Sequence, residues 1–272
     1  MAEQVEKAAR FLALHRRERP LLLPNPWDVG SAKLLASLGF EALATTSSGF
    51  AATLGRLDGS VTRDEATEHA GSIAAATGLP VSADLENGFG DDPSAVAETV
   101  RQALGAGLAG CSIEDYTGHE DEPIYDAGQA AERVSAAAEA AHAGPVHLVL
   151  TARAENYVHG RQDLADTVAR LQSFQEAGAD VLFAPGLSRL EHIRHVVSEV
   201  DLPVNVLARP GAPAVSELAA VGVARVSVGG AFAFAALGAA IEAARELIDE
   251  GTYGYLDRAI TGAKGASSAF RV

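Results

Sequence analysis

The stretch EAGADVLFAPG, residues 176–186, decides the fold. Gly178 ends a helix-like segment, and the apolar run Val181–Ala184 follows shortly after it. This order is typical of the junction between a helix C-terminus and a buried parallel strand. Closely similar junctions stand at Ala106-Gly107 and at Val221-Gly222-Val223. The repeated junction predicts helices that alternate with parallel strands.

Eight short apolar or β-branched runs recur along the chain, at residues 21–23, 42–48, 80–86, 110–115, 146–155, 180–185, 203–208 and 225–229. Ala-rich segments with helical spacing lie between them, such as 94–104, 127–141, 163–177 and 232–248. Thr62 and Glu65 have capping-box spacing, and Asp92 precedes a proline that suits a first helical position. Eight units without a linker favour a closed (β/α)₈ TIM barrel over an open doubly wound sheet.

The barrel is expected to form one domain over residues 1–272. A helix at Gln4–His15, within residues 1–19, would lie across the barrel bottom or flank, and residues 250–272 would form a C-terminal extension. The apolar stretch Val226–Ile241 is interrupted by glycines and falls short of the roughly 20 residues that span a bilayer, so it predicts a buried helix.

Composition excludes several classes of protein. With 48% hydrophobic and 21% charged residues the chain is globular, and 21 basic against 36 acidic residues give a net charge of −15. Such a charge repels polyanions, so neither nucleic acid nor an anionic membrane is an expected partner. The N-terminus lacks the apolar core of a signal peptide, and the lone Cys111 forms no intramolecular disulfide. Both features fit a cytoplasmic protein.

Polar residues gather where the predicted strands end, which is where barrel enzymes assemble their sites. Asp84 and Glu86 are two apart and would point the same way from one strand, while Glu114 on the next strand could reach the same point. Converging carboxylates favour a divalent cation such as Mg²⁺ or Mn²⁺, the alternative being helix capping or pairing with arginine. Arg153 on a further strand would face these acids, around a bound carboxylate or in a structural salt bridge.

Several of these segments together carry a resemblance to a known family. They are NPWDVGSAKLL (25–35), TTSSGFAATLG (45–55) followed by Asp58, SADLENGFG (82–90), SIED (112–115), TARAENYVHGR (151–161), GADVLFAPG (178–186), PVNVLA (203–208) and RVSVGGAFAFAAL (225–237). From about Leu21 to Tyr255 the chain resembles the phosphoenolpyruvate mutase and isocitrate lyase superfamily, whose Mg²⁺-dependent barrels make or break C–C or C–P bonds beside a carboxylate.

The resemblance implies roles for particular residues. Asp84, Glu86 and Glu114 would organise Mg²⁺ (or Mn²⁺), largely through waters, with Asp58 in the outer shell. The family usually has Asp-x-Asp where this chain has Asp84 and Glu86, a departure that changes reach more than charge. Asp84 would also bind the substrate, and Glu114 would also act in catalysis. The backbone N–H groups of Ser47, Ser48 and Gly49 would hold a pyruvate-like fragment, and Arg153 would bind the substrate and stabilise the developing enolate. Trp27 and Asn205 would complete the substrate-binding residues.

The loop after the fourth predicted strand departs from the family. Thr117 stands where the lyase branch has its proton-transferring cysteine, and the loop is short and lacks the mutase pattern. A threonine hydroxyl is a poor acid, so His119 is the candidate replacement unless it is simply solvated. The leading interpretation is C–C cleavage of a small 2-oxo or hydroxy acid, as lyase or decarboxylase. The alternatives are C–P chemistry, as mutase or hydrolase, and a barrel that binds 2-oxo acids without turnover.

The helix after Gly230 predicts assembly. Residues 231–241 are apolar nearly all round, more than the outer helix of a monomer needs. In the resembling family this eighth helix is exchanged between subunits. We therefore expect a homo-oligomer, a dimer or a tetramer.

Overall fold

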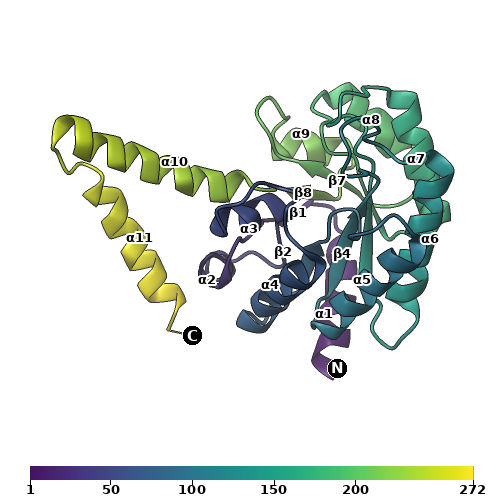
Figure 1. The fold of residues 1–272 in the computed structure, drawn as a ribbon, viewed down its shortest axis with the longest axis horizontal. Coiled ribbons are helices and arrows are strands. Elements are labelled where there is room, and N and C mark those ends of the chain that lie inside the picture. Colours follow the sequence, from purple (N-terminus) through teal and green to yellow (C-terminus); the bar gives the residue numbers. More distant parts are fainter. Residues whose placement is uncertain (272) are drawn as a thin grey trace.

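The computed structural model describes residues 1–271 and forms a barrel of eight parallel strands with helices around it (Figure 1). The strands are β1 (Leu21–Leu23), β2 (Leu43–Ala44), β3 (Val81–Asp84), β4 (Gly110–Glu114), β5 (Val149–Arg153), β6 (Val181–Phe183), β7 (Val204–Leu207) and β8 (Arg225–Ser227). Their order in the sheet is β1-β8-β7-β6-β5-β4-β3-β2. Between β2 and the end of β1, the Ala44 N–H donates to Pro24 O at 3.1 Å, which brings the barrel close to closure. The predicted (β/α)₈ barrel is confirmed.

Helices follow the strands in the predicted alternation. They are α1 (Ala2–Leu14), α2 (Val29–Ser37), α3 (Ser47–Thr53), α4 (Arg63–Ala76), α5 (Pro93–Gly105), α6 (Ala127–His142), α7 (Leu164–Glu176), α8 (Leu190–Glu199), α9 (Val215–Ala220), α10 (Ala231–Arg245) with a π-helical turn at Glu246–Glu250, and α11 (Leu256–Ala269). The capping box of Thr62 and Glu65 is present at α4, and Pro93 opens α5.

The second strand is shorter than the sequence predicted. It ends at Ala44, and Thr46 caps a new helix, α3, by accepting a hydrogen bond from the Gly49 N–H at 3.3 Å. The expected strand over 42–48 was therefore wrong at its carboxyl end, because a threonine in extended conformation starts a helix there when its hydroxyl reaches the first turn.

Helix α1 covers the amino-terminal end of the barrel, as predicted. Phe11 and Leu14 are fully buried against a second apolar cluster that includes Val149 and Val181 at the starts of their strands. A side chain on Gly110 would collide with this helix, since an added Cβ would lie 2.8 Å from Phe11 Cε1 and 2.8 Å from Val149 O. The glycine therefore allows α1 to close the barrel bottom.

We expect Gly110→Ala to lower the free energy of unfolding by about 3 kcal/mol, because neither the strand backbone nor the buried ring can give way. Denaturant unfolding measures this loss. Gly105→Ala is the matched control, since an added Cβ there meets nothing within 4 Å. Equal stability of the two variants would contradict the close packing of α1.

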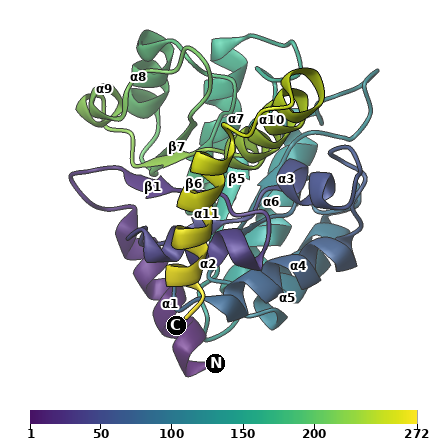
Figure 2. The ribbon, with the colours of Figure 1, turned by 90° about the vertical axis from the view of Figure 1, so that its left-hand side faces the viewer.

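Helices α10 and α11 form an arm that leaves the barrel after β8. In Figures 1 and 2, α10 projects from the barrel and α11 runs back towards α2. The expectation that Val226–Ile241 forms a buried helix is wrong within the single chain: Phe234 is 51% and Ile241 53% exposed, and only Ala233 of α10 is buried. The single chain therefore leaves the apolar side chains of this helix exposed to solvent. Within residues 1–271 no helix is long and apolar enough to cross a membrane.

Candidate active site

A cavity of about 190 Å³ opens at the carboxyl ends of the strands. Many of the predicted site residues line it: Ser47, Ser48, Asp58, Asp84, Arg153 and Asn205. Side chains two apart on one strand share a face, so Ser82 and Asp84 both point into the barrel. Ser112 of β4, which is paired in register with Asp84, lines the same cavity. The predicted location of the chemistry at this end of the barrel agrees with the cavity.

Arg153, the last residue of β5, is the centre of the site. Its Nη1 lies 2.9 Å from Asp84 Oδ1, its Nη2 3.0 Å from Glu114 Oε2, and its Nε 2.8 Å from Glu155 Oε1. Register explains the convergence, because Glu114 and Arg153 are paired on neighbouring strands. Three buried carboxylates around one guanidinium leave an excess of negative charge.

Burial, together with this excess of negative charge, shifts the carboxyl groups towards the protonated form. Burial, together with Asp84 and Asp58, raises the pKa of Glu86 to about 8. Burial also raises the pKa of Glu114 well above its usual range, although Arg153 opposes the shift, and it raises the pKa of Glu155. The pKa of Asp58 is raised by burial and by Asp84. Additional positive charge would relieve all four groups.

Glu86 is not on the strand. Strand β3 ends at Asp84, and Glu86 occupies a turn with φ +48°, so the prediction that the two acids share a strand face was wrong in its geometry. The turn is closed by the Gly88 N–H, which donates to Leu85 O at 2.8 Å. Glu86 still lies beside Asp84, since the Glu86 N–H donates to Asp84 Oδ1 at 3.5 Å. A non-glycine residue in this conformation costs about 1–3 kcal/mol, a strain that is common at functional sites.

The start of α3 contributes backbone N–H groups to the cavity. The Ser47 N–H donates to Asp84 Oδ2 at 3.1 Å, and the Gly49 N–H donates to Thr46 within the cap. Of the three predicted carboxylate-binding N–H groups, two therefore have acceptors within the chain. Gly49 is tightly packed, because an added Cβ would lie 2.5 Å from Thr46 Cγ2.

Five predicted residues do not line the cavity: Gly49, Glu86 and Glu114, described above, and Trp27 and His119. Trp27 is partly buried and lies against Gly49, and its carbonyl accepts from His69 Nε2 at 3.0 Å. His119 is exposed on the loop after β4, where its N–H donates to Thr117 Oγ1 at 3.0 Å. Thr117 in turn donates to Glu122 O at 2.6 Å. Beside this loop, Tyr116 and His159 stack with ring centroids 3.9 Å apart.

Four residues at the site were not predicted to act there. Glu155 binds Arg153, and Thr45 Oγ1 accepts from the Asp84 N–H at 2.9 Å. Asn25 joins three strands: its Nδ2 donates to Thr45 O, and its Oδ1 accepts from Val228 and Gly229 N–H, all at 2.9 Å. Arg225 lines the cavity from below. Glu155 and Asn25 stood at strand ends in the sequence, which was the only signal for them.

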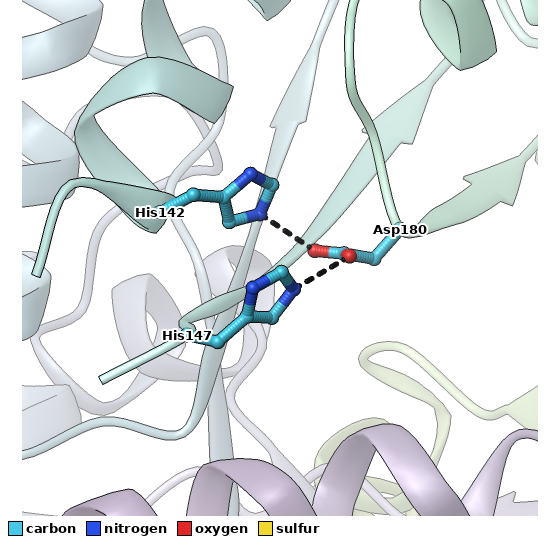
Figure 3. A group of neighbouring side chains, drawn as sticks. All are labelled: His142, His147 and Asp180. Atoms are coloured by element: carbon cyan, nitrogen blue, oxygen red, sulfur yellow. Dashed lines mark hydrogen bonds and ion pairs between the residues drawn. The ribbon is translucent and has the colours of Figure 1, made fainter. Parts of the chain in front are cut away.

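The described residues hold one compact group of histidine and carboxylate ligand atoms (Figure 3). It lies just before the starts of β5 and β6, at the end of the barrel opposite to the acids. His142 Nε2 lies 3.0 Å from Asp180 Oδ2, and His147 Nε2 lies 2.8 Å from Asp180 Oδ1. The two imidazoles are parallel to within 6°, with centroids 4.0 Å apart. Their lone pairs therefore lie in separate parallel planes, and a ring must rotate before one ion can meet both. As it stands the cluster is a hydrogen-bonded clamp between α6, the loop before β5 and the start of β6.

We expect Asp180→Ala to lower the free energy of unfolding by about 2–3 kcal/mol at neutral pH, because the carboxylate also accepts from the Leu150 N–H at 2.8 Å. Burial raises the pKa of Asp180, but hydrogen bonds from His142, Leu150 and His147 lower it by more, so the net pKa lies below its usual value. The contribution is therefore present above pH about 4 and is lost as the pH falls through the lowered pKa. Glu199→Ala is the control, since Glu199 lies 3.8 Å from His195 on the surface. An equal loss in both variants would contradict the clamp.

Comparison with known proteins identifies the family. The sequence model of the phosphoenolpyruvate phosphomutase family matches residues 11–248. An oxaloacetate decarboxylase of Chromohalobacter salexigens is 30% identical, covering 88% of this chain and 84% of that protein. A 2-methylisocitrate lyase of Halalkalibacterium halodurans is 30% identical over 74% of this chain and 67% of its own.

The fold is matched as well. A crystal structure from Burkholderia cenocepacia J2315, assigned to the lyases or mutases, superposes with a TM-score of 0.92 and 52% identity, covering 94% of this chain and 93% of that one. The relatives include a lyase and a decarboxylase, which supports the status of this chain as an enzyme. The chain belongs to the phosphoenolpyruvate mutase and isocitrate lyase superfamily.

Proposed function

We propose that this chain is a Mg²⁺-dependent enzyme that cleaves a C–C bond of a small 2-oxo or 2-hydroxy carboxylic acid through an enolate, as a lyase or decarboxylase. The observation that carries the proposal is Arg153, a cation held by Asp84, Glu114 and Glu155 in a cavity of small-molecule size. Relatives that act as a lyase and a decarboxylase support the reaction class.

The acidic residues fit a divalent cation by their chemistry. Hard oxygen donors are what Mg²⁺ prefers, and Asp58, Asp84, Glu86 and Glu114 exceed the positive charge that Arg153 supplies. Asp84, Glu86 and Glu114 would hold the ion largely through water molecules. When bound, Mg²⁺ would supply Lewis acidity towards the substrate's oxygens.

The chain's own residues would orient the substrate and hold the charge that develops. Arg153 uses three of its five N–H bonds on carboxylates, and the others can donate to an enolate oxygen. Ser47 and Ser48 line the same cavity, where their hydroxyls and the Ser48 N–H can bind the carboxylate next to the cleaved bond. His119 would donate the proton to the enolate carbon. It lies on the exposed loop, so this role requires the loop to approach the cavity.

The test is turnover monitored by NMR, with Mg²⁺ or with EDTA, of isocitrate, 2-methylisocitrate, oxaloacetate, phosphoenolpyruvate and phosphonopyruvate. EDTA-sensitive C–C cleavage is the expected result. Products of C–P chemistry would replace the proposal with the mutase or hydrolase alternative. Metal-dependent binding without turnover of any compound would favour a catalytically silent barrel. If turnover is found, His119→Ala tests whether His119 is the proton donor or only a solvated surface residue. Unchanged turnover in this variant would exclude His119 as the proton donor.

We also propose that the protein is a homo-oligomer in which α10 packs on a second copy, with the eighth helix exchanged between subunits. Phe232, Phe234, Leu237 and Ile241 are all more than a third exposed along this helix. We expect light scattering to give a multiple of the 28.0 kDa chain, and Phe234→Asp to lower the mass. Arg194→Asp, at an exposed position of α8, is the control that should leave the mass unchanged. A wild-type mass of one chain would end the proposal.

A further inference from the structure

The layer of side chains beneath the acids and Arg153 is unusually polar for a barrel interior. Asp84, Glu114 and Arg153 each have a residue with a hydroxyl group two positions earlier on the same strand. These residues are Ser82, Ser112 and Thr151. Barrel interiors are usually filled here by branched apolar side chains. Ser82 and Ser112 instead line the lower part of the cavity, together with Ser227 and Arg225.

Arg225, the first residue of β8, places a guanidinium in this layer. The residue is 4% exposed, and three neutral groups accept its hydrogen bonds. Its Nε donates to Asn205 Oδ1 at 2.9 Å, its Nη2 to Thr151 Oγ1 at 3.1 Å, and its Nη1 contacts His15 Nε2 at 3.1 Å. Because His15 Nδ1 lies 2.8 Å from Phe11 O and donates to it, the Nε2 atom is left as an acceptor.

The guanidinium has no counter-charge in the described chain. No carboxylate of residues 1–271 forms an ion pair with Arg225, and the charge that acts on it is the like charge of Arg153. Burial and Arg153 lower the pKa of Arg225 to about 9, so it remains charged at neutral pH. Of its five N–H bonds, two have no acceptor among these residues. A buried charge without a partner is costly, so a ligand that supplies one is favoured.

We propose that Arg225 and the hydroxyls around it form an anion-binding site inside the barrel, which takes a carboxylate group or a halide ion. The cavity volume corresponds to about six water molecules, enough to hold a small dicarboxylate, and both Arg153 and Arg225 line it. The anion comes from one of two sources: the second carboxylate of the substrate, or a free ion from solution. The first source rests on the proposed function, whereas the anion site itself does not.

Bromide is the probe for the site itself. Crystals of the wild-type protein soaked in molar sodium bromide should show an anomalous peak in contact with the Arg225 guanidinium. Absence of the peak at this concentration overturns the proposal. This measurement needs no turnover and no metal, so its outcome is independent of whether the proposed reaction is found.

A matched pair of variants tests the missing charge. Thr151→Asp places a carboxylate beside Arg225 Nη2, and Thr151→Asn places a neutral side chain of the same size there. The expected result is a higher Tm for T151D than for T151N, with loss of the bromide peak in T151D alone. Equal Tm values and equal bromide occupancy would contradict the need for a counter-charge. Because the two variants have the same volume, a packing defect affects both.

Calorimetry in the presence of Mg²⁺ distinguishes the two sources. If the site holds the substrate's second carboxylate, bromide competes with malonate but leaves the affinity for pyruvate unchanged, and Arg225→Gln weakens malonate at least about tenfold. If a free halide occupies the site, bromide weakens the binding of neither malonate nor pyruvate. Should neither acid bind, the proposed function fails, while the bromide peak still decides the anion site.

Discussion

Turnover should fall by about 10³-fold and the free energy of unfolding by about 3–5 kcal/mol when Arg153 is replaced by methionine. The side chain has two functions in the structure. It would donate to the enolate in the proposed reaction, and it compensates the buried charges of Asp84, Glu114 and Glu155. Removing it leaves three buried or partly buried carboxylates without the cation that they share.

Stability and activity should respond differently to pH in this variant. Protonation relieves the repulsion among the carboxylates that have lost their cation, so the loss of stability in Arg153→Met should become smaller as the pH is lowered. Activity should not return, because the protons do not replace the guanidinium. Arg153→Lys tests the charge alone, because it keeps one cation but cannot bind three carboxylates at once. Denaturant unfolding across pH measures the first effect. Arg189→Met, at an exposed position, is the surface control. Full stability of Arg153→Met at neutral pH would show that the acids do not depend on this residue.

The second large effect is expected when divalent cations are removed. Without metal the pKa of Glu86 is about 8, raised from its usual value by burial and by Asp84 and Asp58. A carboxyl group whose pKa is higher in the folded state contributes its full stabilisation below its unfolded pKa of about 4.5. The contribution is then lost as the pH rises through 8. We expect EDTA-treated protein to lose on the order of 3 kcal/mol over this window.

Added Mg²⁺ should restore stability mainly at the upper end of the window, where Glu86 is ionised and can bind the ion. Thermal melts from pH 4.5 to 8.5, with EDTA or with Mg²⁺, measure both effects. Glu86→Gln is the control, because it keeps the shape of the side chain and cannot titrate. It should be less dependent on pH without metal and gain less from Mg²⁺. A wild-type protein whose melting is insensitive to Mg²⁺ at every pH would argue against a metal at these acids.

The order of strands and helices could be predicted from the sequence because its signals are local. A glycine such as Gly178 ends a helix within one turn, and the apolar run that follows is a strand of a parallel sheet whatever its partners are. Since the carboxyl ends of the strands in a barrel meet at one end, the sequence also indicated that Asp84, Glu114 and Arg153 lie together. Their ion pairs agree with that expectation.

The conformations at the strand ends could not be predicted in this way. Glu86 leaves the strand for a left-handed turn, and Thr46 starts a helix where a strand was expected to continue. Both depend on single hydrogen bonds across a turn, which compete with strand pairing by small energies. The exposed arm of α10 is a different case. Its apolar sequence led to the expectation of a partner surface, which stays a prediction, while the expectation that the helix is buried was wrong for the single chain.

The sequence by itself determined the barrel of alternating units and the acids Asp84 and Glu114 beside Arg153, because helix ends, strand hydrophobicity and residue spacing are properties of neighbouring residues. Only the tertiary structure decided that Glu155 completes the carboxylates around Arg153, that Asp180 binds two histidines at the far end, and that Arg225 is buried without a carboxylate. These arrangements join residues from strands far apart in the chain. Their distances follow from closure of the barrel and the register of its strands, which no local pattern specifies.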